Sequence, residues 1–143
     1  MRVTDSESQS IKAKDKNMSK KGYKKLIVWE KAHKVAMEVY KATAQFPKEE
    51  LYGLTSQIRR SALSVPLNIV EGHASNSKKE FLSFLNIANR SLVETEYLLE
   101  VVQELGFLTQ AAYQLLENSR SEVGIVLNAF VKGLRKSRFC PSL

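Results

Sequence analysis

Apolar residues recur along this chain at spacings of three and four, a pattern that predicts four helical segments. We expect the first helix over residues 26–45, the second over 51–72, the third from about 77 to 105 and the fourth over 110–136. No stretch sustains the alternation of apolar and polar residues that marks a strand. Because the connections are short, the pattern predicts an all-α fold, an antiparallel up-down-up-down four-helix bundle.

One apolar stripe on each predicted helix is expected to face the core. The stripes comprise Val28, Ala32, Val35, Val39 and the ring of Tyr40; Leu54, Ile58, Ala62, Val65 and Ile69; Phe81, Leu85, Ala88, Leu92, Leu99 and Val102; and Tyr113, Leu116, Val123, Leu127, Phe130 and Leu134. Pro47 ends the first helix, and Gly72 is expected to cap the second. Ser77 and Glu80 form the S-x-x-E pattern of a capping box, and Thr109 is expected to cap the start of the fourth helix.

The second predicted helix carries a second apolar arc. Leu63, Leu67 and Val70 lie roughly 130° from the core stripe when each residue turns the helix by about 100°. A polar stripe lies between the two arcs and consists of Gln57, Ser61, Ser64, Asn68 and Glu71. Because a four-helix monomer has only one core, we expect the second arc to face another subunit.

Pro66 lies inside the same helix. A proline there removes the hydrogen bond to the carbonyl of Ala62 and crowds that carbonyl, at a cost of about 3 kcal/mol. Two interpretations remain open. A kink could serve a subunit contact or a bound ligand, which places Pro66 in the interface with the second arc, or the bend could fit the curvature of the bundle itself.

Three stretches carry a resemblance to a known family: LIVWEKAHKVAMEVYKAT, FPKEELYGLTSQIRRSALSVPLNIVEG and SKKEFLSFLNIANRSLVETEYLLEVVQELGFL. From about Tyr23 to the end of the fourth helix, the chain closely resembles the 23S rRNA intervening-sequence proteins, a family of four-helix bundles. The resemblance implies bundles that pack side by side into a homopentameric ring. The accessory variability protein of diversity-generating retroelements is a distant relative, a basic pentamer that binds nucleic acid and a reverse transcriptase.

This similarity makes nucleic-acid binding, to structured RNA or to DNA, the leading hypothesis for function. One alternative is a protein adaptor that docks a partner such as a reverse transcriptase. Another is a structural ring without a ligand.

The net charge of +7 belongs to the two ends of the chain, because residues 26–131 hold slightly more acidic than basic residues. We expect residues 1–22 to form a disordered basic tail, 23–137 the bundle and 138–143 a short C-terminal tail. Met18 could be the natural start. Basic tails can bind polyanions, although a solvated tail that keeps a protein soluble is an alternative interpretation.

Basic residues supply the candidate nucleic-acid contacts. Arg59 and Arg60 carry planar guanidinium groups suited to phosphate; an ion pair with Glu50, Glu71 or a neighbouring subunit is the alternative. The other candidates lie near the chain ends and are Lys20, Lys21, Lys24, Lys25, Lys132, Arg135, Lys136 and Arg138. Cations at the end of the fourth helix also complement its dipole, whatever the function. A pentamer would bring five sets of these ends together and attract polyanions.

The sequence offers little for catalysis. Cys140 is the single cysteine, so no intrachain disulfide forms and a reducing, cytoplasmic setting is expected. His33 and His73 are the only histidines and have no accompanying ligand set for a metal. Ser61 and Ser64 are expected to serve packing or to hydrogen-bond to the backbone rather than to act as nucleophiles. We find no phosphate-binding loop, secretory signal or membrane-spanning run, and we expect no enzyme activity, metal, cofactor or membrane partner.

Overall fold

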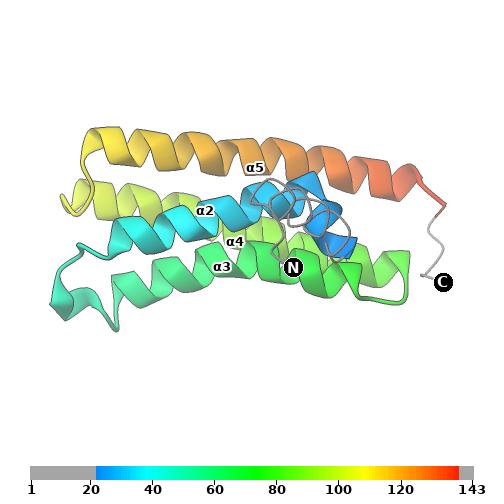
Figure 1. Cartoon of the computed structure of the whole chain (residues 1–143), viewed down its shortest axis with the longest axis horizontal. Coiled ribbons are helices and arrows are strands. Elements are labelled where there is room, and N and C mark those ends of the chain that lie inside the picture. Colours follow the sequence, from blue (N-terminus) through cyan, green and yellow to red (C-terminus); the bar gives the residue numbers. More distant parts are fainter. Residues whose placement is uncertain (1–21, 139–143) are drawn as a thin grey trace, which may run out of the picture.

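The computed structural model describes residues 22–138, and in that range it contains four long α-helices and no strand (Figure 1). The long helices are α2 (Ile27–Thr43), α3 (Leu54–His73), α4 (Lys78–Glu104) and α5 (Gln110–Lys136), and the short 3-10 helices are η1 (Gly22–Lys25) and η2 (Lys48–Glu50). The all-α prediction is confirmed, and each long helix lies within a few residues of its predicted bounds. The candidates Lys20 and Lys21, like Met18 and Cys140, lie outside the described residues.

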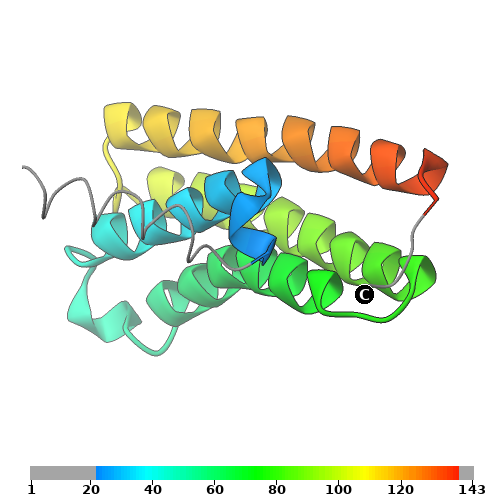
Figure 2. The same cartoon turned by 45° about the vertical axis from the view of Figure 1, so that its right-hand side comes forward.

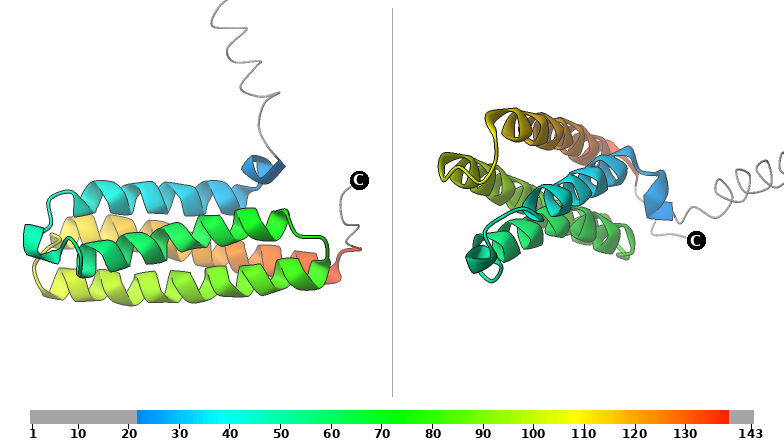
Figure 3. Two further views of the ribbon diagram at one scale, coloured as in Figure 1. Left: turned by 90° about the horizontal axis from the view of Figure 1, so that it is seen from below. Right: turned by 60° about the vertical axis from the view of Figure 1, so that its left-hand side comes forward.

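Contacts between helix ends define how the helices pair. Arg59, in the second turn of α3, donates a hydrogen bond to Thr43 at the end of α2 (2.7 Å). Lys78, the first residue of α4, donates to the carbonyl of Ser137 just beyond α5 (2.7 Å). Figures 1 and 3 show the start of α2 and the end of α5 at the same end of the molecule. In Figure 2, η1 lies against the start of α2.

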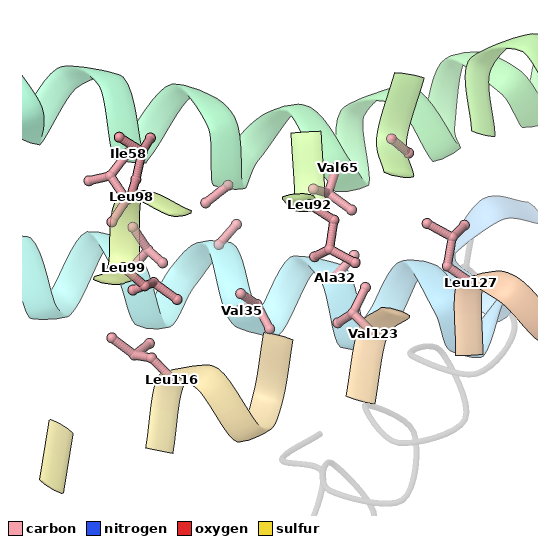
Figure 4. Close-up of a cluster of buried hydrophobic side chains, with 14 of the residues drawn as sticks. Ala32, Val35, Ile58, Val65, Leu92, Leu98, Leu99, Leu116, Val123 and Leu127 are labelled. Atoms are coloured by element: carbon pink, nitrogen blue, oxygen red, sulfur yellow. The ribbon is translucent and has the colours of Figure 1, made fainter. Parts of the chain in front are cut away.

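Buried side chains from all four long helices meet along the bundle axis (Figure 4). The predicted stripes of α3 and α4 are buried, apart from the half-buried Leu54. In α5, Tyr113, Phe130 and Leu134 are half-buried at the margin of the core. Tyr40 was wrongly assigned to the core, because its ring is 38% exposed and the fully buried Ala36 contributes to the α2 stripe instead. Each fully buried leucine, isoleucine or valine contributes roughly 1.5–3 kcal/mol.

Two predicted helix starts are confirmed with one change. The Ser77 hydroxyl accepts a hydrogen bond from the backbone N–H of Glu80 (3.1 Å), as a cap should. The Glu80 carboxylate accepts from the N–H of Asn76 (3.4 Å) instead of that of Ser77, so the reciprocal half of the capping box is shifted by one residue. The Thr109 hydroxyl accepts from the N–H of Ala112 (3.1 Å) and caps α5.

The prediction that Gly72 caps the second helix is wrong. α3 continues through Gly72 to His73, and Gly72 is buried where α3 meets α4. A Cβ at this position would lie only 3.0 Å from Phe81 Cδ1 and from Phe84 Cβ. Gly72 therefore permits the close approach of two helices and does not form a turn.

The glycine that ends a helix is Gly106, which follows α4 with a φ of +82°. The N–H of Phe107 donates to the carbonyl of Val102 (2.9 Å), the bond that closes a Schellman motif. The Phe107 ring then packs against buried Phe46, with 5.6 Å between the ring centroids. This end of the bundle is closed by apolar contacts.

The middle of the polar stripe predicted between the two arcs of α3 faces α4, whereas Gln57 and Glu71 are exposed. Ser61 and Asn68 are buried, and Ser64 is half-buried. Ser64 and Ser91 share a hydrogen bond between their hydroxyls (2.8 Å), and Thr95 donates to the hydroxyl of Ser61 (3.1 Å). Ser61 also donates to the carbonyl of Ile58 (3.1 Å), so these serines both pack between the helices and, in the case of Ser61, bond to the backbone as predicted.

Pro66 does not interrupt α3, which runs through it as one helix. Its side chain is buried within the chain, whereas Leu63 and Leu67 are 38% and 50% exposed and Val70 is half-buried. Pro66 therefore does not share the exposed surface of the second arc. A subunit that covers the second arc would contact Leu63, Leu67 and Val70 rather than the buried Pro66 side chain, and this contact remains a prediction.

Candidate nucleic-acid interface

One end of the bundle gathers most of the predicted basic residues. It is formed by η1, the segment that joins α3 to α4, and the last turns of α5 (Figure 3). The basic side chains there are Lys24, Lys25, Lys78, Lys79, Lys132, Arg135, Lys136 and Arg138. The acidic residues in the same segments, 22–25, 71–80 and 132–138, are Glu71 and Glu80. Folding thus brings the charge of two distant sequence segments to a single end, which we call the basic end.

Lys78 has a structural role at the basic end. Its ammonium group donates hydrogen bonds to the backbone carbonyls of Arg135 and Ser137, which the helix itself leaves without partners. This lysine therefore closes α5 and complements its dipole.

Seven cations at this end are both exposed and free of ion pairs within residues 22–138: Lys24, Lys25, Lys79, Lys132, Arg135, Lys136 and Arg138. Such cations retain their attraction for an external polyanion, because no carboxylate neutralises them locally. They are the residues best placed to contact phosphate groups.

Arg59 is not part of this group. Its side chain donates to the Thr43 hydroxyl (2.7 Å), and its guanidinium carbon lies 4.9 Å from the centroid of the Tyr40 ring. Within residues 22–138 Arg59 forms no ion pair with Glu50 or Glu71, and Glu50 instead accepts a hydrogen bond from the N–H of Leu54 (3.1 Å). Arg59 joins α2 to α3 through contacts with Thr43 and Tyr40, which neither sequence interpretation included.

Arg60 is exposed but lies far from the basic end. His73 lies thirteen positions after it in α3, which corresponds to about 20 Å along the helix. It borders a polar hollow of about 470 Å³ between α3 and α4, to which Glu94 and the 94% exposed Tyr52 also contribute. Arg59 and Arg60 therefore do not form one site with the basic ends of the chain.

An apolar surface covers the outer side of α2 and α3. Leu63 and Leu67 of α3 lie on it with Met37 and Tyr40 of α2, all of them exposed. The Arg59–Tyr40 contact shows that these sides of the two helices adjoin. That Leu63 and Leu67 leave the core is confirmed, and the subunit that would cover them remains a prediction. We call these four residues the α2–α3 apolar face.

A buried ion cluster escaped the sequence analysis. Arg120 is buried and donates two hydrogen bonds to Glu117 (2.6 and 2.7 Å), while Glu96 of α4 lies 3.5 Å away. The hydrogen bond to Glu117 raises the pKa of Arg120, and burial raises the pKa of the neighbouring Tyr113 hydroxyl. Position 120 lies four residues after Leu116 in the apolar stripe, and this spacing is the signal that could have revealed it. The cluster ties α5 to α4 and offers no open site.

The described part of the chain contains neither a candidate metal site nor a helix that could span a membrane. Residues 22–138 contain no group of three or more His, Cys, Asp or Glu side chains positioned to hold a metal ion. None of the helices in this range combines the length and apolar character needed to cross a bilayer. His33 stacks on Trp29 with 4.9 Å between ring centroids, and His73 contacts Phe81 edge-on at 6.3 Å.

Comparison with known proteins agrees with this architecture. The sequence pattern of the family described as 23S rRNA-intervening sequence protein matches residues 24–129. A solved structure from Bacteroides thetaiotaomicron, a protein of unknown function from the S23 ribosomal protein family, superimposes with a TM-score of 0.67. The two are 28% identical over 74% of this chain and 99% of that protein. No protein of curated function matches. The family match ends before Lys132, so the basic last turns of α5 lie beyond it.

Proposed function

The chain belongs to the family of 23S rRNA-intervening sequence proteins, and from this premise we propose that it is a non-enzymatic protein that binds nucleic acid. It acts as a homopentameric ring of antiparallel bundles, with the basic ends gathered on one rim. The observation that carries the proposal is the basic end itself, where exposed cations from both ends of the described chain meet without neutralising carboxylates.

Phosphate contact is the chemistry that these cations favour. Lys24, Lys25, Lys132, Lys136 and Arg138 are exposed at the ends of helices and lack the built geometry that reads base edges. Binding therefore depends on charge and falls steeply with salt, because each phosphate contact releases a condensed counterion. A ring with aligned subunits multiplies the number of contacts and strengthens this dependence.

Two separate apolar surfaces support ring assembly. A ring needs a head-to-tail contact in which one surface of a subunit meets a different surface of the next. The α2–α3 apolar face supplies the first surface. Val93 and Tyr97, which are exposed on the outer side of α4, supply the second. Exposed apolar patches on a small domain commonly mark such contacts.

The alternative function is a protein adaptor that docks a partner such as a reverse transcriptase. The observation that favours it is the exposed pair Tyr52 and Arg60 beside the α2–α3 apolar face, away from the basic end. Tyrosine and arginine are enriched among residues that dominate protein–protein binding energy. In this function any nucleic-acid contact is incidental.

Size-exclusion chromatography with light scattering, with absorbance recorded at 260 and 280 nm, tests the assembly and its cargo. We expect a mass near five times 16.2 kDa and excess 260 nm absorbance that disappears in high salt. A monomer would contradict the ring. A pentamer that carries no nucleic acid and binds no added RNA would favour the adaptor.

A matched pair of variants tests the location of binding. Lys132→Gln with Lys136→Gln removes two charges from the basic end, and Lys41→Gln with Lys48→Gln removes two from the opposite end. Lys41 and Lys136 both lie in the last turn of a long helix, so each pair loses one such dipole interaction. We expect RNA affinity to fall about tenfold or more in the first pair only, with a smaller salt slope. Equal losses in both pairs would contradict a basic-end site.

A further inference from the structure

A groove between α4 and α5 opens beside the basic end. Its volume is about 450 Å³, within the range of small-molecule sites, and leucine and valine side chains form its floor. Three asparagines border it, Asn86 and Asn89 from α4 and Asn128 from α5. Arg135 lies at one end of the groove, and Gly124 lines it from the middle of α5.

Within the described chain, the three asparagine amides that border the groove form no hydrogen bonds that would stabilise their own helices. Asparagine is unfavourable inside a helix, because its amide competes for backbone hydrogen bonds in other conformations. Asn68 and Asn118 offset this by hydrogen-bonding to groups of their own helices. The amides that border the groove have no hydrogen-bond partner within residues 22–138. Three such amides converge on one groove and leave donors and acceptors unused.

The packing of the bundle also gives no reason for a glycine at position 124. Glycine in the middle of a helix is also unfavourable. A Cβ at position 124 would meet only Leu92 Cδ2, at an ordinary contact distance of 3.6 Å. Gly72, in contrast, leaves no room for a Cβ beside Phe81. Packing therefore explains Gly72 but does not explain Gly124, which lines the groove.

Arg135 supplies the charge at this site. Lys78 holds its backbone carbonyl, which fixes the main chain at this point of α5. Its guanidinium group has no carboxylate or carbonyl partner among the residues that the structure describes. A planar, unpaired guanidinium beside a groove suits a phosphate group.

We propose that the α4–α5 groove binds a nucleotide. The base lies on the aliphatic floor beside Gly124, the asparagine amides pair with its polar edge, and Arg135 contacts its phosphate. An amide offers one donor and one acceptor side by side, which matches the edge of a base. The source is either a free mononucleotide or an unpaired residue of a bound RNA, and the second source rests on the proposed function. In that case the groove adds a preference for single strands to the charge-driven contacts of the basic end.

The test uses the full chain with fluorescein-labelled single-stranded RNA, an RNA duplex of equal length and adenosine 5′-monophosphate. Gly124→Ala adds a methyl group to the groove lining, and Asn89→Ala with Asn128→Ala removes two amides. Gly133→Ala is the matched control, because it lies in the same helix, meets nothing within 4 Å and does not line the groove.

We expect both groove variants to melt at or above the temperature of the parent and yet to bind single-stranded RNA more weakly. For the asparagine double variant the loss should be about fivefold per amide removed, and duplex binding should be unchanged in both variants. Gly133→Ala should raise the melting temperature and leave binding unchanged. If Gly124 serves binding at the expense of stability, its replacement should raise the melting temperature and lower the RNA affinity. A purely structural role for Gly124 does not predict this combination.

The outcomes separate this proposal from the proposed function. If RNA binds but neither groove variant weakens it, and the mononucleotide does not bind, the groove proposal is overturned while the basic end stands. If RNA does not bind but the mononucleotide does, and Gly124→Ala abolishes that binding, the groove binds a free nucleotide and the proposed function is wrong. Binding of neither ligand to the parent chain overturns both.

Discussion

The two ends of the bundle satisfy their polar groups in different ways. At the end formed by η2 and the connection from α4 to α5, Gly106 closes the helix through backbone bonds, and Phe46 packs on Phe107. At the basic end, a lysine side chain closes α5 and exposed cations remain unpaired. The first end uses its residues to complete the fold. The second leaves charge and hydrogen-bonding groups available, which is why we place function there.

The largest effect is expected from opening the closed end. Phe46→Ala removes a buried ring from its contact with Phe107 and should lower the free energy of unfolding by about 3–5 kcal/mol. Urea denaturation at a fixed protein concentration measures the change. Tyr52→Ala is the control at the same end, because its ring is 94% exposed, and it should change stability by less than about 0.5 kcal/mol. Similar losses for both would show that the apolar closure does not hold this end.

We expect a smaller loss of unfolding free energy from a substitution where α3 meets α4 near the basic end. Gly72→Ala improves helix propensity but places a Cβ 3.0 Å from Phe81 and Phe84, so we expect a net destabilisation of about 1–3 kcal/mol. The same denaturation assay applied to Gly133→Ala should show a gain of up to about 1 kcal/mol, because that position is open. If Gly72→Ala stabilises the protein, the close contact is not a constraint.

These two glycines illustrate how much of the structure the sequence could reveal. The periodicity of apolar residues predicted the bounds of four helices, because each helix carries the spacing of its apolar face in its own sequence. The role of Gly72 depends on Phe81, which approaches from another helix, and no local pattern contains that information. The sequence therefore suggested a helix cap where the structure has a contact between helices.

The candidate site was predictable to a similar extent. Charge counting found the cations at the two ends of the chain, but only folding places Lys24 beside the same end of the bundle as Lys132. Arg59 could not be excluded from the site without knowing that Tyr40 and Thr43 of α2 hold it. The groove depends on asparagines from two helices and escaped the sequence analysis entirely.

We expect the hydrogen bonds that Lys78 donates at the basic end to contribute about 1 kcal/mol to the free energy of unfolding. Lys78→Met keeps the aliphatic stem but loses the hydrogen bonds to the carbonyls of Arg135 and Ser137, so the last turn of α5 should fray. Hydrogen exchange of the amides in this turn measures fraying, and urea denaturation measures the global loss. Lys79→Met removes the same charge from the exposed neighbour and should leave exchange unchanged. Equal exchange in both variants would indicate that charge, not capping, matters at this position.

The smallest effect distinguishes asparagines that hold the fold from those that border the groove. Asn68 is buried and bonded to the Ser64 carbonyl, so Asn68→Ala should cost about 1 kcal/mol. Asn128 is exposed with no partner in the described chain, so Asn128→Ala should instead raise stability by about 0.5 kcal/mol through helix propensity. Paired urea titrations resolve the sign even where the magnitudes are small. A loss of stability in Asn128→Ala would mean that this amide stabilises the bundle. Asn128 would then not count among the groups that the basic end leaves available for a ligand.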